Sequence, residues 1–117
     1  MARVVALIPD LLFGSNVVGA LGAAGHETVL VSDADALARE LPAAQLLIVD
    51  LTADADQRIE QVRQVRRSGI PTLAFYAHVE ADVRHRAEAA GFELVVPRSR
   101  MAREGAALVE RLSAAGP

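Results

Sequence analysis

The chain has 117 residues, which fits a single domain, and 52% of them are hydrophobic but only 3% aromatic, so the core must be mainly aliphatic. Its net charge is −3, and its 12 basic residues, all of them arginine, are interspersed with 15 acids, which argues against a face that binds nucleic acid. The absence of cysteine excludes disulfides, thiolate catalysis and cysteine-ligated metals, and no apolar stretch has the length of a membrane span.

Five apolar runs alternate with five helical patterns, and we expect residues 1–117 to form one domain whose last three or four residues fray. The predicted elements, in chain order, are strand Val4–Ile8, helix Leu11–Ala24, strand Thr28–Val31, helix Asp33–Leu41, strand Gln45–Asp50, helix Asp54–Arg67, strand Thr72–Tyr76, helix Glu80–Ala90, strand Glu93–Val96 and helix Met101–Ser113. Strict alternation with short links predicts a three-layer, doubly wound α/β fold with a parallel five-stranded sheet. The common strand order for five such units is the flavodoxin-like 2-1-3-4-5.

Polar residues and glycines mark the expected helix ends. Ser32 or Asp33 is expected to cap the second helix, and Asp54 the third. The first helix is unusual, because Gly14, Gly19 and Gly22 interrupt it at a cost of about 0.5–1 kcal/mol each relative to alanine. Two explanations remain open: close packing against the sheet, or a ligand-accepting first turn at residues 14–16 (Gly14, Ser15 and Asn16).

One carboxylate stands out in this pattern. The most apolar run, residues 46–49, ends in Asp50 and predicts a fully buried parallel strand. Open α/β sheets place their ligands at the carboxyl ends of such strands, so Asp50 is the first candidate for a functional residue.

The spacing of the units, and two segments within them, resemble the CheY-like receiver domains of response regulators. Residues 70–77 (IPTLAFYA) are similar to a receiver fourth strand, and residues 89–93 (AAGFE) to the turn into the fifth. The resemblance covers nearly the whole chain. It implies an acidic pair after the first strand, a phosphoacceptor aspartate after the third, a threonine or serine after the fourth, and a lysine followed by proline after the fifth.

The chain departs from that pattern at most of these positions. Asp50 matches the phosphoacceptor, but Asp10 is a single acid where receivers have two. Tyr76 stands at the hydroxyl position, Arg98 at the lysine and Ser99 at the proline. The chain therefore resembles an atypical, degenerate receiver of the stand-alone pseudo-receiver kind.

The substitutions leave several chemistries open. Asp10 and Asp50 can supply two oxygen ligands to Mg²⁺. Arg98 can hold a phosphoryl group bidentately, or it can pair with Asp50 and lock it. Arg98 and Ser99, with the loop at Gly14, can also form an anion site at the start of the fifth helix.

Histidine adds one further candidate. His78 follows the fourth strand at the edge that carries Asp50 and Arg98, where an imidazole can bind an anion or titrate near neutral pH. His26 and His85 are expected on the surface. The three histidines lack metal-ligand spacing.

Three functions follow from these residues. The first is a non-enzymatic, cytoplasmic signalling module that contacts a kinase or another signalling protein, or forms a homodimer, through the fourth helix, fifth strand and fifth helix. The second is a working receiver that uses Asp50 with Mg²⁺. The third is a small-ligand or anion site of Asp50, His78 and Arg98. None of the three involves nucleic acid or a membrane.

Overall fold

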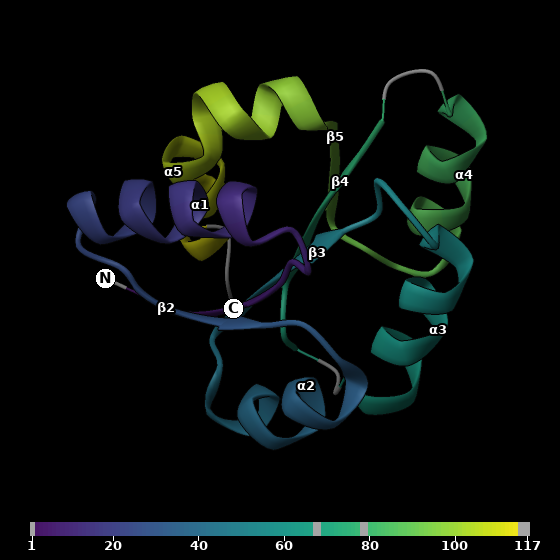
Figure 1. Ribbon diagram of the computed structural model, residues 1–117, viewed down its shortest axis with the longest axis horizontal. Helices are drawn as coiled ribbons and strands as arrows, with labels where there is room; N and C mark the ends of the chain where they lie inside the picture. The colour runs from purple at the N-terminus through teal and green to yellow at the C-terminus, as the bar shows by residue number, and fades with distance from the viewer. Residues whose placement is uncertain (1, 67–68, 78–79, 115–117) are drawn as a thin grey trace.

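The computed structural model describes residues 2–66, 69–77 and 80–114. Five strands and five helices alternate along these described residues, with a short 3₁₀ turn after the second helix (Figure 1). They are β1 (Arg3–Leu7), α1 (Leu11–Ala23), β2 (Glu27–Val31), α2 (Ala34–Glu40), η1 (Leu41–Ala43), β3 (Leu46–Asp50), α3 (Ala55–Val65), β4 (Thr72–Tyr76), α4 (Ala81–Ala89), β5 (Leu94–Pro97) and α5 (Arg98–Ala114).

The sheet has the predicted order β2-β1-β3-β4-β5, and every strand pair is parallel. Figure 1 shows α1 and α5 on one side of the sheet and α3 and α4 on the other. β3 and β4 are buried along their whole length, as their unbroken apolar runs predict for strands covered on both faces. The predicted fold class is therefore confirmed.

Each face of the sheet has its own aliphatic core. On one face, alternate residues of β1, β3 and β4 pack under α1 and α5, and Phe75 is the largest side chain there. The other face packs under α2, α3 and α4, and Phe92 contributes its ring. Side chains alternate along a strand, and those of Leu46 and Ile48 face α1 and α5. Asp50, two residues after Ile48, therefore points to the same face of the sheet.

Two of the predicted helix boundaries are wrong. α5 begins at Arg98, three residues before the predicted Met101, because residues 98–100 contain no helix breaker even though the apolar periodicity begins only at Met101. α3 ends at Val65, so Arg66 lies just beyond the helix, and Arg67, the predicted last residue, lies outside the described residues.

The two aspartates before α2 and α3 behave differently. Asp33 has an extended backbone and its Oδ1 accepts a hydrogen bond from the amide of Ala36 at 2.8 Å, as predicted for an N-cap. Asp54 occupies the corresponding position before α3, but its φ is 51° and its side chain makes no cap hydrogen bond. The predicted cap is wrong because a left-handed backbone turns the carboxylate away from the first helical amides.

Close packing explains only one glycine of α1. A Cβ on Gly14 would lie 2.9 Å from both Cδ atoms of Leu30 in β2, so a larger residue there would force the Leu30 side chain to shift. At Gly19 and Gly22 a Cβ would meet nothing within 4 Å. These two glycines weaken the helix without any packing gain inside the domain.

His26 is buried, with 6% of its surface exposed, so its predicted surface position is wrong. The amide of Ala2 donates to Nδ1 at 3.0 Å, and Nε2 lies 3.2 Å from Oε1 of Glu110 on α5. His26, which follows the turn after α1, therefore packs beneath α5. No local sequence pattern indicates this contact. His85 on α4 is exposed, as expected.

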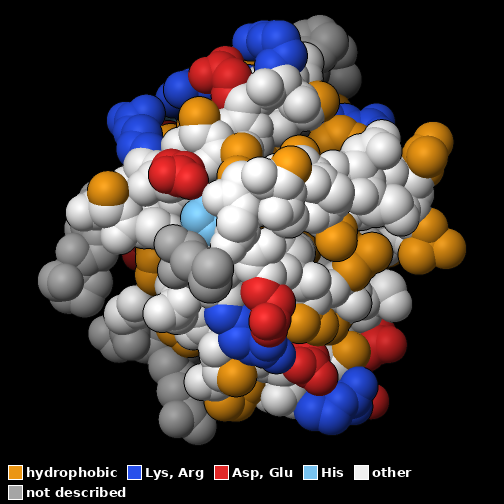
Figure 2. Space-filling model, turned by 90° about the vertical axis from the view of Figure 1, so that its left-hand side faces the viewer, with side chains coloured by type: hydrophobic (Ala, Val, Ile, Leu, Met, Phe, Trp, Pro, Cys, Tyr) orange, Lys and Arg blue, Asp and Glu red, His pale blue; other side chains and the backbone are white. Residues whose placement is uncertain are grey.

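The surface carries mixed charge. Figure 2 shows small groups of acidic and arginine side chains side by side on one face, separated by uncharged surface. Ion pairs between the described residues bring opposite charges together: Arg3 pairs with both Glu27 and Glu40, and on α4, at the far side of this view, Arg86 pairs with Asp82. Surface pairs of this kind contribute little to stability.

Candidate functional site

Four of the predicted site residues lie at the carboxyl edge of the sheet. Asp10 follows β1, Asp50 ends β3, Tyr76 ends β4 and Arg98 follows β5. In the sheet register Asp50 is paired with Phe75 and Tyr76 with Pro97, which places the ends of β3, β4 and β5 at one level. The crossover direction reverses between β1 and β3, and open α/β sheets bind their ligands at that point.

Arg98 forms an ion pair with Asp10. Its Nη2 lies 3.5 Å from Oδ2 of Asp10, and its guanidinium carbon lies 4.5 Å from the ring centroid of Phe13. Oδ1 of Asp10 accepts a hydrogen bond from the amide of Phe13 at 3.0 Å and caps α1. Both charged side chains are about half exposed. Asp10 and Phe13 together therefore fix where the arginine lies.

Asp50 has a different partner. Its Oδ1 accepts two hydrogen bonds from Thr52, one from the amide at 2.8 Å and one from the hydroxyl at 2.5 Å. Only 5% of the residue is exposed. Among the described residues Asp50 forms no ion pair, so the interpretation in which Arg98 locks Asp50 is wrong. The arginine instead reaches the more exposed acid at the end of β1.

A depression of about 490 Å³ lies beside the ion pair. It is lined by Phe13, Ala77, Pro97, Arg98, Ser99 and Ala102. Arg98 and Ser99 are the polar groups of this wall, and both are exposed. A small anion would meet the guanidinium and the first amides of α5 there.

The other predicted residues that the structure describes do not contribute to the ion pair or to the depression, although Tyr76 ends β4 at the same edge. Tyr76 is buried and belongs to the core under α2, α3 and α4. Gly14 packs on β2, and Ser15 and Asn16 lie on the exposed side of α1, in the second turn of a continuous helix. His78 lies outside the described residues, so its place at this edge stays a prediction.

The carboxylates present fit Mg²⁺ poorly. Both oxygens of Asp10 and one oxygen of Asp50 are already engaged by Phe13, Arg98 and Thr52. A permanent cation next to Asp10 also repels a divalent metal. Within the described part of the chain, no cluster of three or more acidic or histidine side chains has the arrangement of a metal site.

Sequence reasoning missed two residues that shape the site. Thr52 lies two positions after Asp50, a spacing at which an aspartate side chain often accepts a bond from the backbone amide. Phe13 lies three positions after Asp10, and its ring also contacts Phe75 with centroids 4.9 Å apart. The Asp-x-Thr spacing is a usable signal; nothing local indicates that Phe13 would support an arginine from the far end of the chain.

Comparison with known proteins points to one fold. No family model matches the sequence, and no curated protein does. The structure is similar to the receiver domain of Francisella response regulator 1452 (TM-score 0.83, 12% identity, 98% of each chain covered). It is also similar to a response regulator receiver protein from Burkholderia phymatum (TM-score 0.82, 22% identity, 100% and 99% covered) and to NtrX from Brucella abortus (TM-score 0.84, 20% identity).

The alignment with NtrX covers 97% of this chain but 27% of NtrX. At these identities the likeness establishes the fold, which is that of CheY-like receiver domains, and the resemblance predicted from the sequence is confirmed at that level. No helix in the described residues is both long enough and apolar enough to cross a bilayer.

Proposed function

We propose that this chain is an atypical, receiver-like signalling module of the cytoplasm that acts by contact with another protein and does not depend on phosphorylation of Asp50. The receiver fold supports a signalling role. The residues at the carboxyl edge that differ from the receiver pattern support the independence from phosphorylation. A fold alone does not determine function, so the argument has to come from the site.

The ion pair between Asp10 and Arg98 carries this proposal. Phosphoryl transfer to an aspartate requires the negative charge of the phosphoryl group to be neutralised as it arrives. Here the permanent cation of the edge is already paired with the single acid after β1. The chain has no lysine to supply a second, movable charge. The charge of Asp10 is therefore compensated inside the domain, without phosphate and without metal.

Intact-protein mass spectrometry tests this directly. Wild-type protein and Asp50→Asn would be incubated with acetyl phosphate and Mg²⁺, beside a conventional receiver domain as the positive control. We expect the control to gain one phosphoryl group and both forms of this chain to gain none. An adduct on the wild type that Asp50→Asn lacks would overturn the proposal.

One observation favours a working phosphoacceptor as the second candidate. Thr52 fixes one oxygen of Asp50 from the backbone side, and Arg98 lies half exposed at the same edge, where its planar fork suits a phosphoryl group. If Asp50 does accept phosphate, Arg98→Ala should abolish the adduct and Arg98→Lys should retain it.

The depression beside Arg98 and Ser99 supports a third candidate, a site for a small anion. Inorganic phosphate would then raise the melting temperature of the wild type. Substituting His78 by alanine would abolish that rise if the histidine takes part, and an unchanged rise would remove His78 from the mechanism.

The partner surface predicted from the sequence is the face of α4, β5 and α5. In the structure the apolar residues of that face are buried in the domain itself, and they are Val83, Ala87, Leu108, Val109 and Leu112. The outward side of α4 carries paired charges, and the guanidinium of Arg86 lowers the pKa of Asp82. A dimer or kinase contact here would rest on polar groups, and it stays a prediction.

A further inference from the structure

α1 differs from every other helix of the domain. Its 13 residues include no charged side chain, whereas α2, α3, α4 and α5 each carry acids and arginines. A helix on the surface of a soluble domain normally turns charged residues to the solvent. The outward residues of α1 are instead uncharged, and most are small or apolar: Leu11, Leu12, Ser15, Asn16, Gly19, Ala20, Gly22 and Ala23.

Two large apolar side chains project from this helix. Leu11 is 72% exposed and Leu12 75%, and they are the exposed large hydrophobic residues of the described chain. They lie in the first turn of α1, adjacent in sequence to Phe13. Scattered exposed leucines are common, but two in succession on a helix that also lacks charge form an apolar projection.

The glycines of the same helix leave its outer surface open. A Cβ at Gly19 or Gly22 would meet nothing within 4 Å, so the bare backbone there is not used by the domain itself. Viewed down the helix axis, the exposed half of α1 carries, in order around the helix, Ser15, Gly19, Leu12 and Ala23. Bare backbone at this position allows another helix to approach closely.

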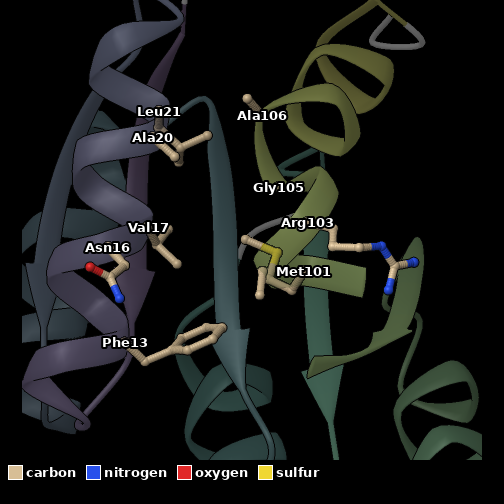
Figure 3. Close-up of a pocket in the computed structure, with 10 residues that line it drawn as sticks. Phe13, Asn16, Val17, Ala20, Leu21, Met101, Arg103, Gly105 and Ala106 are labelled. Carbon is tan, nitrogen blue, oxygen red and sulfur yellow. The ribbon is translucent and has the colours of Figure 1, made fainter. Parts of the chain in front are cut away.

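A groove of about 450 Å³ runs along the side of this surface, between α1 and α5 (Figure 3). Phe13 and Val17 point from α1 towards α5, and Met101 points back from α5. On the α5 side Gly105 and Ala106 leave the groove wide, because neither carries a side chain long enough to fill it. The groove is mainly apolar, with Asn16 and Arg103 as the polar residues of its lining.

We propose that the α1 face, meaning the exposed residues of α1 together with the groove between α1 and α5, binds a second copy of this chain. In a two-fold dimer the same surface is used by both partners and must complement itself. The α1 face meets that condition, because an apolar projection (Leu11 and Leu12) and an apolar groove lie beside each other. Leu12 of each copy would enter the groove of the other.

Electrostatics selects a second copy as the occupant. A charged side chain buried against the exposed residues of α1 would lose its hydration without gaining an opposite charge there, which is strongly unfavourable; the charged residue of the groove is Arg103 of α5, whose side chain points away from α1. The occupant must therefore present an uncharged helix. Within the described chain α1 is the helix that does so, and the outward sides of α2, α3, α4 and α5 do not.

Sedimentation equilibrium from about 1 to about 200 µM tests the proposal, because mass action makes the dimer fraction depend on concentration. We expect the wild type to pass from monomer to dimer over this range. Ala20→Glu, at the rim of the groove, should weaken the dimer at least tenfold without lowering the melting temperature of the monomer. The matched control is Ala89→Glu, an exposed alanine on α4, which should dimerise like the wild type.

Single cysteines give a second readout, since the chain contains no cysteine of its own. Ser15→Cys should form a disulfide-linked dimer under mild oxidation, and Ala89→Cys should not. A wild type that stays monomeric at the highest concentration would overturn the proposal. So would a dimer that Ala89→Glu breaks and Ala20→Glu leaves intact, which would instead place the interface on α4 near α3. Neither result bears on phosphorylation of Asp50, which mass spectrometry decides separately.

Discussion

His26 joins the start of β1 to α5 through both nitrogens of its ring. Because Nδ1 accepts from the amide of Ala2, the proton of a neutral imidazole lies on Nε2 and can be donated to Glu110. The contact with Ala2 is buried, whereas the side chain of Glu110 is 60% exposed. The two bonds should therefore differ in what they contribute to stability.

We predict that His26→Ala lowers the free energy of unfolding by about 2–4 kcal/mol, because it leaves a buried amide unpaired and creates a cavity. Glu110→Gln should cost less than about 1 kcal/mol, since it removes only an exposed pair. Urea denaturation of the two variants measures both values. Equal losses would show that the contact with Glu110, rather than that with Ala2, is the one that matters.

Arg66 joins separate elements, as His26 does, and it lies at the edge of the sheet opposite to the one that carries Asp50. Its Nη1 donates to Oγ1 of Thr72 at 2.9 Å and to Oε1 of Glu93 at 3.2 Å, and its Nη2 donates to the carbonyl of Gly91 at 3.2 Å. Its guanidinium carbon also lies 5.3 Å from the ring centroid of Phe92. One planar group thus ties the start of β4 to the end of α4.

Arg66→Lys should lower the free energy of unfolding by about 1–3 kcal/mol, because a single ammonium group cannot reproduce the fork that reaches these separate acceptors. Arg63→Lys is the matched control, since Arg63 contacts Glu60 on an exposed surface, and it should change stability by less than about 0.5 kcal/mol. Thermal denaturation followed by circular dichroism measures both. If Arg66→Lys is as mild as the control, the arginine fork is dispensable.

At the scale of the helices, α2 and α3 offer a comparison of two N-terminal aspartates. Asp33→Ala removes a real cap and should cost about 1 kcal/mol. Asp54→Gly removes no cap and relieves a left-handed backbone, so it should leave stability unchanged or raise it by up to about 1 kcal/mol. Guanidinium titrations would compare the two variants. A loss at Asp54→Gly that equals the loss at Asp33→Ala would mean that Asp54 does cap α3 in solution.

The same pair shows where element boundaries can be predicted and where they cannot. The strands lie within one or two residues of their predicted positions, because buried parallel strands in this chain are unbroken apolar runs. Capping depends on a backbone angle at one residue, and Asp33 and Asp54 look alike in sequence. The start of α5 was misplaced for a related reason: residues 98–100 are helical without being apolar.

At the scale of the whole molecule, topology predicts which residues share an edge but not which of them pair. Parallel strands bring Asp10, Asp50 and Arg98 to the same edge, and that much followed from the sequence. The choice of Asp10 over Asp50 as the partner of Arg98 depends on Phe13, whose ring supports the guanidinium, and on Thr52, which occupies Asp50. Both are contacts of tertiary structure.

That pairing determines how the whole domain should respond to Mg²⁺. A ligand that binds only the folded state stabilises it by RT ln(1 + [L]/Kd), or about 1.4 kcal/mol when the metal is at tenfold its Kd. For a domain of this size such a gain raises the melting temperature by about 4–7 °C. Because Arg98 already neutralises Asp10, we predict a shift below about 1 °C for the wild type in about 10 mM Mg²⁺.

Removing the arginine should reverse this behaviour. Arg98→Ala frees a carboxylate beside Asp50, so the melting temperature of this variant should rise with added Mg²⁺, and adding Asp10→Asn to it should cancel the rise. Differential scanning fluorimetry with and without EDTA makes the comparison. A Mg²⁺-dependent rise in the wild type that Asp10→Asn removes would mean that the metal displaces Arg98. The edge would then be a competent metal site, and this result would favour the phosphoacceptor function of Asp50, which the mass-spectrometry experiment tests directly.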